Sequence, residues 1–303
     1  MLRLLIVSHF SQKKRTFAKT FAKFAFFPVS YYTEIMGKKK TDSTQDIQQN
    51  TVINPLIDPE LFEEARQFVF RKMTSAGGIG TLGEKSIHAV LKYYYAPDDR
   101  YHEQKVGNYV ADILVDGEII EIQTRNFNTL RDKLRAFLAE HEVTIVYPLP
   151  YIKWLSWVDP ETGEVSQKRK SPKRGSIYDI MRELYRIKTF LPDPHLHFAV
   201  CMINVEETRI LNGWSKDKKK GSEREDGIPI QIHDDVRFDI AGGYEQFLPD
   251  TLPEQFTSSD FRIHAGVNMG TANLTLNILT YVGIVERIGK DGRAYLYERR
   301  IRT

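Results

Sequence analysis

The sequence predicts an α/β protein in which a mixed sheet flanked by helices is followed by a smaller C-terminal domain. Helix-like and strand-like apolar patterns alternate over residues 59–211, and the hairpin signal Asp116-Gly117 lies between two aliphatic runs. From residue 256 onward the pattern changes to two short helices followed by two strands. We expect a poorly ordered N-terminal segment at 1–54, the α/β domain at 55–212, a connector at 213–255 and the C-terminal domain at 256–303.

Length and composition suit two domains of ordinary size. Of the 303 residues, 41% are apolar and 27% are charged, which is typical of a globular chain in water. The net charge of +3 is too small to indicate a nucleic-acid partner, so local basic runs carry more information. The single cysteine, Cys201, excludes an intramolecular disulfide and a cysteine-based zinc site. We expect Cys201 in the core and the protein in the cytoplasm.

The first 35 residues contain one acidic side chain, Glu34, and open with an apolar run too short to span a bilayer. They fit an amphipathic or targeting segment, or an upstream start of a gene whose working start is Met36. No transmembrane helix is expected elsewhere, so the sequence predicts no membrane partner.

Residues Thr81–Tyr95 carry the pattern of an amphipathic helix. Its apolar stripe consists of Ile87, Val90, Leu91 and Tyr94. Glu84 extends this stripe and so points inward, unless it is only a first-turn acid that the helix dipole favours. The next pattern, Tyr101–Val106, predicts a strand in which His102 and Gln104 share a face.

The hairpin around Asp116-Gly117 places two acids opposite each other. Counting outward from the turn pairs Asp112 with Glu121. Directly opposed like charges are destabilising, so a pair set among aliphatic residues needs a compensating cation. The alternative is a solvated sheet face on which water screens both acids. Gln123 follows Glu121 on the same face of its strand, and a divalent metal site is expected here.

Four further elements follow before the C-terminal domain. We expect a helix at Asn128–His141, a strand at Glu142–Pro148, a hairpin around Asp159–Gly163 and a helix at Ser176–Phe190. A basic run separates the hairpin from the second helix, and it is either a solvated loop or a phosphate contact. Its cations are Lys168, Arg169, Lys170, Lys173 and Arg174. Gly213–Gly227 reads as an exposed loop of mixed charge, and 228–253 has no clear period.

The C-terminal segment predicts a helix ending near Val267, a helix at Thr271–Tyr281 and two strands, Ile284–Ile288 and Ala294–Arg299. This order resembles a winged helix-turn-helix domain, which implies that the second helix recognises DNA. The candidate contacts are Thr271, Asn273, Thr275 and Asn277 on the helix and Lys290 and Arg293 at the strand turn. A module that docks a protein partner is the alternative.

The order of the elements over Pro59–Leu211 resembles the PD-(D/E)XK, or restriction endonuclease-like, nuclease superfamily. The resemblance implies that Glu84, Asp112 and Glu121 bind Mg²⁺ or Mn²⁺ and that Gln123 stands where the family has a lysine. Hard oxygen donors suit these ions, and the main-chain carbonyl of Ile122 would complete the set. His102 and Gln104 are candidate contacts behind the metal ligands, or simply packed strand residues.

Two positions depart from the family pattern. Ala111 replaces a proline, and Gln123 offers a neutral amide that positions water without adding positive charge. We expect a magnesium-dependent nuclease that hydrolyses phosphodiester bonds, in DNA, with the C-terminal domain positioning the substrate. Two alternatives stay open, namely a catalytically inactive nuclease-like protein that binds nucleic acid or has a regulatory role, and a structural or partner-docking protein. Whether the chain forms a homodimer is also open.

Overall fold

The computed structural model describes residues 57–75, 86–159, 161–214 and 220–300. The chain divides into two compact units, Met1–Val52 and Ile53–Thr303, and every described residue belongs to the second. The predicted N-terminal segment therefore lies outside the described residues. No helix of the described part is both long and apolar enough to cross a membrane.

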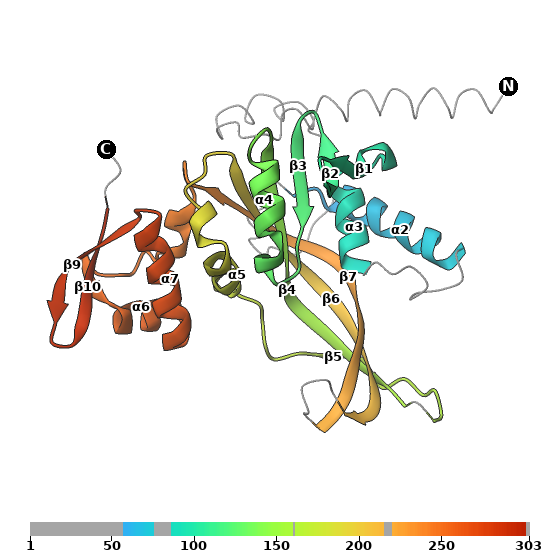
Figure 1. Cartoon of the computed structure of the whole chain (residues 1–303). Coiled ribbons are helices and arrows are strands. Elements are labelled where there is room, and N and C mark those ends of the chain that lie inside the picture. The colour runs from blue at the N-terminus through green and yellow to red at the C-terminus, as the bar shows by residue number, and fades with distance from the viewer. Residues whose placement is uncertain (1–56, 76–85, 160, 215–219, 301–303) are drawn as a thin grey trace, which may run out of the picture. The chain divides into compact units, whose positions relative to one another are not determined.

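A seven-stranded mixed sheet organises this unit, which confirms the mixed α/β prediction (Figure 1). Its order is β1-β2-β3-β4-β6-β7, and β5 pairs with β4. The strands are β1 His102–Val106, β2 Tyr109–Val115, β3 Glu118–Ile122, β4 Glu142–Val158, β5 Arg169–Lys170, β6 Leu196–Trp214 and β7 Lys220–Asp239. The first three strands form an antiparallel meander, β3-β4 and β4-β6 are parallel, and β6-β7 is antiparallel.

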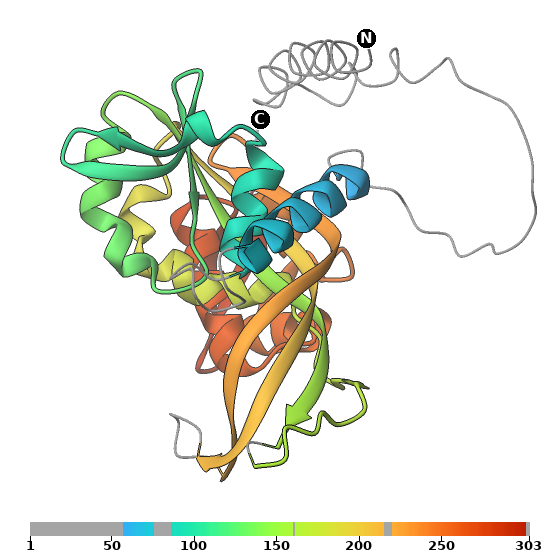
Figure 2. The ribbon, with the colours of Figure 1, turned by 90° about the vertical axis from the view of Figure 1, so that its right-hand side faces the viewer.

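Helices cover both faces of this sheet (Figures 1 and 2). Those on one face lie in the crossover connections that the parallel neighbours β3-β4 and β4-β6 need. The helices α4 Arg131–Phe137 and α5 Met181–Arg186 pack on one face, against a core that includes Ile145 and Phe198. The helices α2 Pro59–Ser75 and α3 Ser86–Tyr95 pack against each other and β7 on the other face.

Two helices are shorter than predicted. The 3₁₀ turn Phe127–Leu130 precedes α4, which ends at Phe137, so the predicted Asn128–His141 helix loses its last turn. The predicted Ser176–Phe190 helix is divided into the 3₁₀ turn Ile177–Ile180, α5 and the 3₁₀ turn Lys188–Phe190. Short segments packed on a sheet are held by tertiary contacts more than by helix propensity, which explains the misjudged lengths.

The structure corrects the prediction for residues 213–253. Trp214 still belongs to β6, and β7 runs from Lys220 to Asp239, so the expected mixed-charge loop is mostly strand. The patternless segment also contributes sheet. The β6-β7 pairing has four register irregularities, which break the alternation of side chains that would have signalled a strand. Together with β4, these strands continue past the helices as a twisted arm (Figures 1 and 2).

The β4 strand contains one irregularity of its own. Its register with β6 shifts between Pro150 and Lys153, so that one extra residue lies on the β4 side. Before the shift Ile145 neighbours Phe198, and after it Trp154 neighbours Glu206. An extra residue of this kind is a β-bulge, which bends and twists the strand locally.

The C-terminal part contains β8 Gln255–Thr257, α6 Ser258–Ala265, α7 Met269–Tyr281, β9 Val285–Asp291 and β10 Ala294–Arg299. The three strands form a sheet in the order β8-β10-β9. Thr257 caps α6 in a capping box with Asp260, and the Asn268 side chain caps α7. Phe256, Leu276 and Leu184 belong to one hydrophobic core, so this part shares its core with α5 and the large sheet.

Candidate active site

The hairpin between β2 and β3 has the register that the sequence predicts. Asp116 has φ 50° and Gly117 has φ 87°, and positive φ at both positions matches the two-residue turn expected from Asp-Gly. Val115 pairs with Glu118 and Ile113 pairs with Ile120.

Asp112 and Glu121 come next along this hairpin, and each accepts a backbone hydrogen bond from the opposite strand. The Asp112 amide donates to Glu121 Oε1 at 3.2 Å, and the Ile122 amide donates to Asp112 Oδ2 at 2.8 Å. The side chain of Glu121 is 3% exposed and that of Asp112 is 16% exposed. The two acids therefore face each other away from bulk water, and the solvated sheet face is wrong for this pair.

Two basic side chains from different helices contact these carboxylates. Lys133 of α4 places Nζ 2.6 Å from Glu121 Oε2. His88 of α3 places Nε2 3.2 Å from Asp112 Oδ2. The hairpin thus supplies the two acidic side chains, while helices packed against the sheet supply the two basic ones.

The two carboxyl groups respond differently to this environment. Burial, and then the charge of Asp112, raises the pKa of Glu121 to about 7 although Lys133 opposes the change. Burial also acts to raise the pKa of Asp112, but the His88 hydrogen bond and charge, the Ile122 amide and Lys133 outweigh it and leave the pKa lowered. Just below neutral pH the pair consequently carries one negative charge, with the proton on Glu121.

The neighbours of Glu121 in the predicted motif have other contacts. The Gln123 amide donates to the Val146 carbonyl at 2.9 Å and continues the β3-β4 ladder. Its side-chain Nε2 donates to the Arg125 carbonyl at 2.6 Å, so the carboxamide is engaged with the following loop. The Ile122 side chain is buried. Glu84 lies outside the described residues.

His102 and Gln104 make local contacts in β1. His102 Nε2 lies 2.7 Å from the Ala96 carbonyl oxygen, and its ring packs edge-on against Tyr93. Gln104 Nε2 donates to the His102 carbonyl. These contacts correspond to the packed-strand alternative, because none of them reaches Asp112 or Glu121.

The basic run lies along the outer edge of β4. The Ser171 amide donates to the Lys153 carbonyl and the Gly175 amide to the Tyr151 carbonyl. A side chain at Gly175 would place Cβ 2.5 Å from the Pro150 carbonyl oxygen, so only glycine allows this approach.

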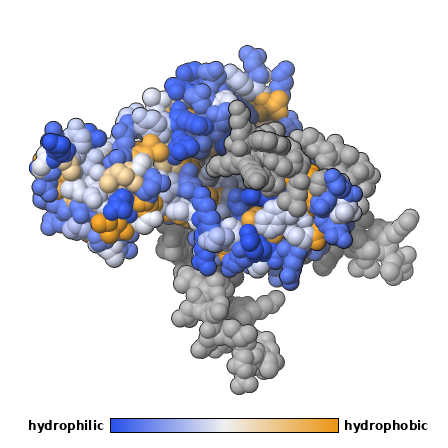
Figure 3. Space-filling model, turned by 90° about the horizontal axis from the view of Figure 1, so that it is seen from below, coloured by the Kyte–Doolittle hydropathy of each residue, from blue (hydrophilic) through white to orange (hydrophobic). Residues whose placement is uncertain are grey.

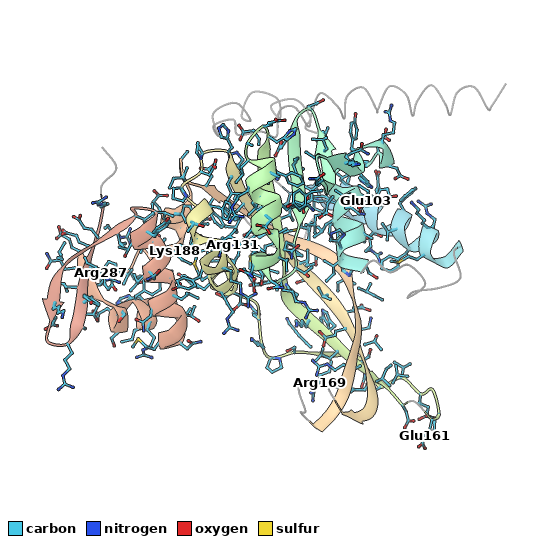
Figure 4. All side chains as sticks on the ribbon, viewed as in Figure 1. Glu103, Arg131, Glu161, Arg169, Lys188 and Arg287 are labelled. Carbon is cyan, nitrogen blue, oxygen red and sulfur yellow. The ribbon has the colours of Figure 1, made fainter. Side chains whose placement is uncertain are left out.

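Several cations of the basic run stack over aromatic rings. Arg169 lies over Trp157, Lys170 over Trp154 and Arg174 over Tyr151, with distances of 5.2 to 5.9 Å to the ring centres. Lys168 pairs with Glu206, and Lys173 is exposed. Figure 4 places Arg169 on the arm formed by β4, β6 and β7. The run is thus attached to the sheet rather than being a free loop.

The predicted recognition helix α7 is covered over much of its surface. Thr275 is buried and donates to the Thr271 carbonyl, so it is unavailable for a base contact. Asn277 accepts a hydrogen bond from Lys188 beside α5. Asn273 is exposed and Thr271 is partly exposed.

The turn between β9 and β10 is open to solvent. Lys290 and Arg293 are both exposed, and Lys290 lies 5.5 Å from the ring centre of Tyr295. Figure 3 shows a mainly hydrophilic surface with small, separate apolar patches in the view from below.

The sequence reasoning did not single out His88 and Lys133. His88 directly follows Ile87, a member of the apolar stripe of this helix, and that position was the signal by which it could have been found. Lys133 could have been found from the rule that a crossover helix packs back on the strands it joins, here β3 and β4. Among the described ranges, no group of three or more His, Cys, Asp or Glu side chains has an arrangement that could hold a metal ion.

Comparison with known proteins gives two matches. Residues 85–239 match the family described as "Domain of unknown function (DUF8091)". An "Uncharacterized protein" of Treponema pallidum (strain Nichols) is 30% identical over 226 residues, which covers 73% of this chain and 87% of the relative. No solved structure matches the chain significantly.

Proposed function

Because this chain belongs to the family of the domain of unknown function DUF8091, its activity must be inferred from the site, and we propose a metal-dependent nuclease. It would hydrolyse phosphodiester bonds, in DNA, in the cytoplasm. The observation that carries the proposal is the buried pair Asp112 and Glu121, which share a hairpin and hold a proton near neutral pH.

The order of elements supports a restriction endonuclease-like core. A helix, α3, precedes the antiparallel meander β1-β2-β3, and the α4 crossover then leads to the parallel strand β4. This is the order on which the resemblance to the PD-(D/E)XK superfamily rests. The acids fall on β2 and β3, as that pattern requires.

The donor set fits Mg²⁺ or Mn²⁺. Asp112 and Glu121 offer hard oxygen ligands, and one or two carboxylates together with a substrate phosphate are usual for Mg²⁺. The Ile122 carbonyl and Glu84 are the further ligands that the sequence predicts. When bound, the ion would supply positive charge at the phosphate and a water of lowered pKa.

We propose that Lys133 supplies the positive charge that the superfamily's lysine would provide and that Gln123, at that position, lacks. Its ammonium group lies 2.6 Å from Glu121 Oε2, on a helix that crosses from β3 to β4. If Glu121 served as a metal ligand, the Lys133 ammonium group would turn to a phosphate oxygen of the substrate. His88 would act by holding the Asp112 carboxylate in place.

The basic run would bind the DNA backbone. β3 occupies the outer edge of β4 up to Val146, and the basic run occupies the same edge from Tyr151 onward. Five residues separate these points, which corresponds to about 16 Å at the usual strand rise. Lys290 and Arg293 would contribute a second phosphate contact from the β9-β10 turn.

A catalytically inactive nucleic-acid-binding protein is the second candidate. It is favoured by the contacts of Lys133 with Glu121 and of His88 with Asp112, which give each carboxyl group a basic partner without a metal ion. The engagement of the Gln123 carboxamide with the Arg125 carbonyl points the same way.

Cleavage assays with matched variants separate the two candidates. Plasmid and labelled oligonucleotides should be cut in millimolar Mg²⁺ or Mn²⁺, and Asp112→Asn and Glu121→Gln should abolish cleavage. Asp116→Asn is the control, because it removes an exposed acid from the same hairpin and asparagine tolerates the positive φ. Calorimetry should detect metal binding that Asp112→Asn removes. DNA binding without cleavage or metal binding would favour the second candidate, and the absence of all three would reject both.

A further inference from the structure

The arm carries an aromatic platform that we define as Tyr151, Trp154 and His233. Tyr151 and His233 stack at 4.1 Å between ring centres with an angle of 12° between planes. Trp154 lies beyond them on β4 and is partly exposed, and His233 is exposed. Arg174 lies over Tyr151 and Lys170 over Trp154. Flat rings and cations therefore alternate along one stretch of the arm.

The platform lies on the same face of the sheet as Glu121. Glu121 neighbours Ile145 and Ile145 neighbours Phe198, both in the core beneath α4 and α5. Trp154 neighbours Glu206 on β6. Residues an even number apart on a strand share a face, so Glu206 lies on the side of Phe198. Tyr151 also packs against this core.

The cations of the platform are placed to contact phosphates beside stacked bases. Lys168 forms a salt bridge with Glu206, the neighbour of Trp154 on β6. Lys170 lies opposite Trp154 in the register of β5 with β4. A base entering over Trp154 would displace Lys170, whose ammonium group could then move to the adjacent phosphate. Aromatic faces next to a positively charged track are the recurring means of binding single strands, because every base has a face to stack. In a duplex these faces are already occupied by neighbouring bases.

We propose that this platform binds unpaired nucleotides, so that the substrate of the enzyme is DNA with a single-stranded segment. The statement about the substrate rests on the proposed nuclease function, whereas the proposed binding of unpaired nucleotides rests only on the residues of the platform. Tyr151 is six residues and Trp154 nine residues along β4 from Ile145, which corresponds to about 20 to 30 Å at the usual rise. A single strand held on the platform would extend from the arm toward the carboxylate pair.

Binding is measured by fluorescence anisotropy in EDTA, so that cleavage plays no part. The probes are labelled oligo(dT) of about 20 nucleotides, longer than a typical single-strand site, its duplex with oligo(dA), and an abasic strand of equal length. The full chain should bind oligo(dT) about 10-fold more tightly than the abasic strand, since one base–aromatic stack contributes about that order.

Trp154→Leu should lower the affinity for oligo(dT) by about 10-fold and leave the affinities for the abasic strand and the duplex unchanged. Trp154→Phe should restore most of the loss because it keeps a ring. Tyr185→Leu is the matched control, since Tyr185 is an exposed aromatic residue with Lys188 over its ring on α5.

The salt dependence separates stacking from charge. Trp154→Leu should keep the slope of log affinity against log salt, whereas Lys170→Gln should reduce it by about 0.7, the contribution of one phosphate contact to a single strand. Equal affinity of wild type and Trp154→Leu for oligo(dT), with thermal unfolding showing both folded, would overturn the platform. Equal binding of the oligo(dT) and abasic strands would do the same.

The result is independent of the nuclease proposal. Base-dependent binding without cleavage in Mg²⁺ or Mn²⁺ would refute the nuclease and keep the platform. Cleavage of duplex DNA that Trp154→Leu does not alter, together with unchanged oligo(dT) binding, would keep the nuclease and refute the platform.

Discussion

Replacing Glu121 by glutamine should remove a pH-dependent loss of stability. The environment of Glu121 raises its pKa from 4.5 to about 7, mainly through burial and then through the charge of Asp112. Between these two pH values the folded chain binds more protons than the unfolded chain, so the free energy of unfolding falls as the pH rises. This pKa difference corresponds to about 3 kcal/mol, because one pH unit is about 1.4 kcal/mol.

The measurement is urea unfolding of wild type and Glu121→Gln in EDTA from about pH 5 to about pH 8.5. Wild type should lose about 3 kcal/mol relative to the variant over this range. Asp112 does not interfere, since its pKa is lowered and its contribution is lost only as the pH falls through the acidic range below its ordinary value. Asp116→Asn, which alters an exposed acid on the same hairpin, should follow wild type.

Adding Mg²⁺ at pH 8 extends the test. An ion that binds the ionised pair should restore stability to wild type, by about 2.7 kcal/mol at a concentration 100 times the Kd, and not to Glu121→Gln. Parallel pH profiles for wild type and Glu121→Gln would refute the reasoning, because they would show that Glu121 titrates alike in the folded and unfolded chains.

Three further outcomes are expected. Lys133→Gln should lower cleavage by about 10²-fold or more with metal affinity retained, whereas Gln123→Ala should have a smaller effect because the Gln123 side-chain amide already donates to the Arg125 carbonyl. Steady-state kinetics measures cleavage and calorimetry measures metal affinity. A larger loss of cleavage in Gln123→Ala than in Lys133→Gln would return Gln123 to the site. Lys290→Glu with Arg293→Glu should weaken duplex binding and reduce its salt slope by about 0.9 for each phosphate that is no longer neutralised, and an unchanged slope would indicate a partner-docking role for the C-terminal part. Glu142 raises the pKa of His195 by a hydrogen bond, so Glu142→Gln should lower the pH at which the His195 ring titrates by NMR.

The sequence was most informative where structure is local. The Asp116-Gly117 turn needs positive φ at two adjacent positions, and that requirement alone determines which residues of the hairpin face each other. The opposition of Asp112 and Glu121 follows from it by counting. Cys201 was likewise predicted correctly as a core residue from its apolar surroundings in the strand.

The parts that were missed depend on contacts between distant segments. Lys133 and His88 reach the acids only because α4 and α3 pack beside the hairpin. The periodicity of a single segment does not predict such contacts between segments. β7 was missed because its bulges interrupt the alternation of side chains. The recognition-helix reading overlooked that α7 packs on α5, which buries Thr275 and engages Asn277.

The bulge in β4 determines which residues of the arm can serve the candidate site. Ile145 and Trp154 are an odd number of residues apart, so in a regular strand they would point to opposite faces of the sheet. The extra residue between Pro150 and Lys153 reverses this parity and brings Trp154 to the side of Glu121. A β4 strand with all of these residues but no bulge would turn Trp154 away from that face and bring Leu155 and Trp157 onto it. Deleting Ile152 would remove the bulge and leave Trp154 eight residues from Ile145, still on the side of Glu121. The bulge, and not residue type alone, therefore sets the composition of the surface that a nucleic acid would meet.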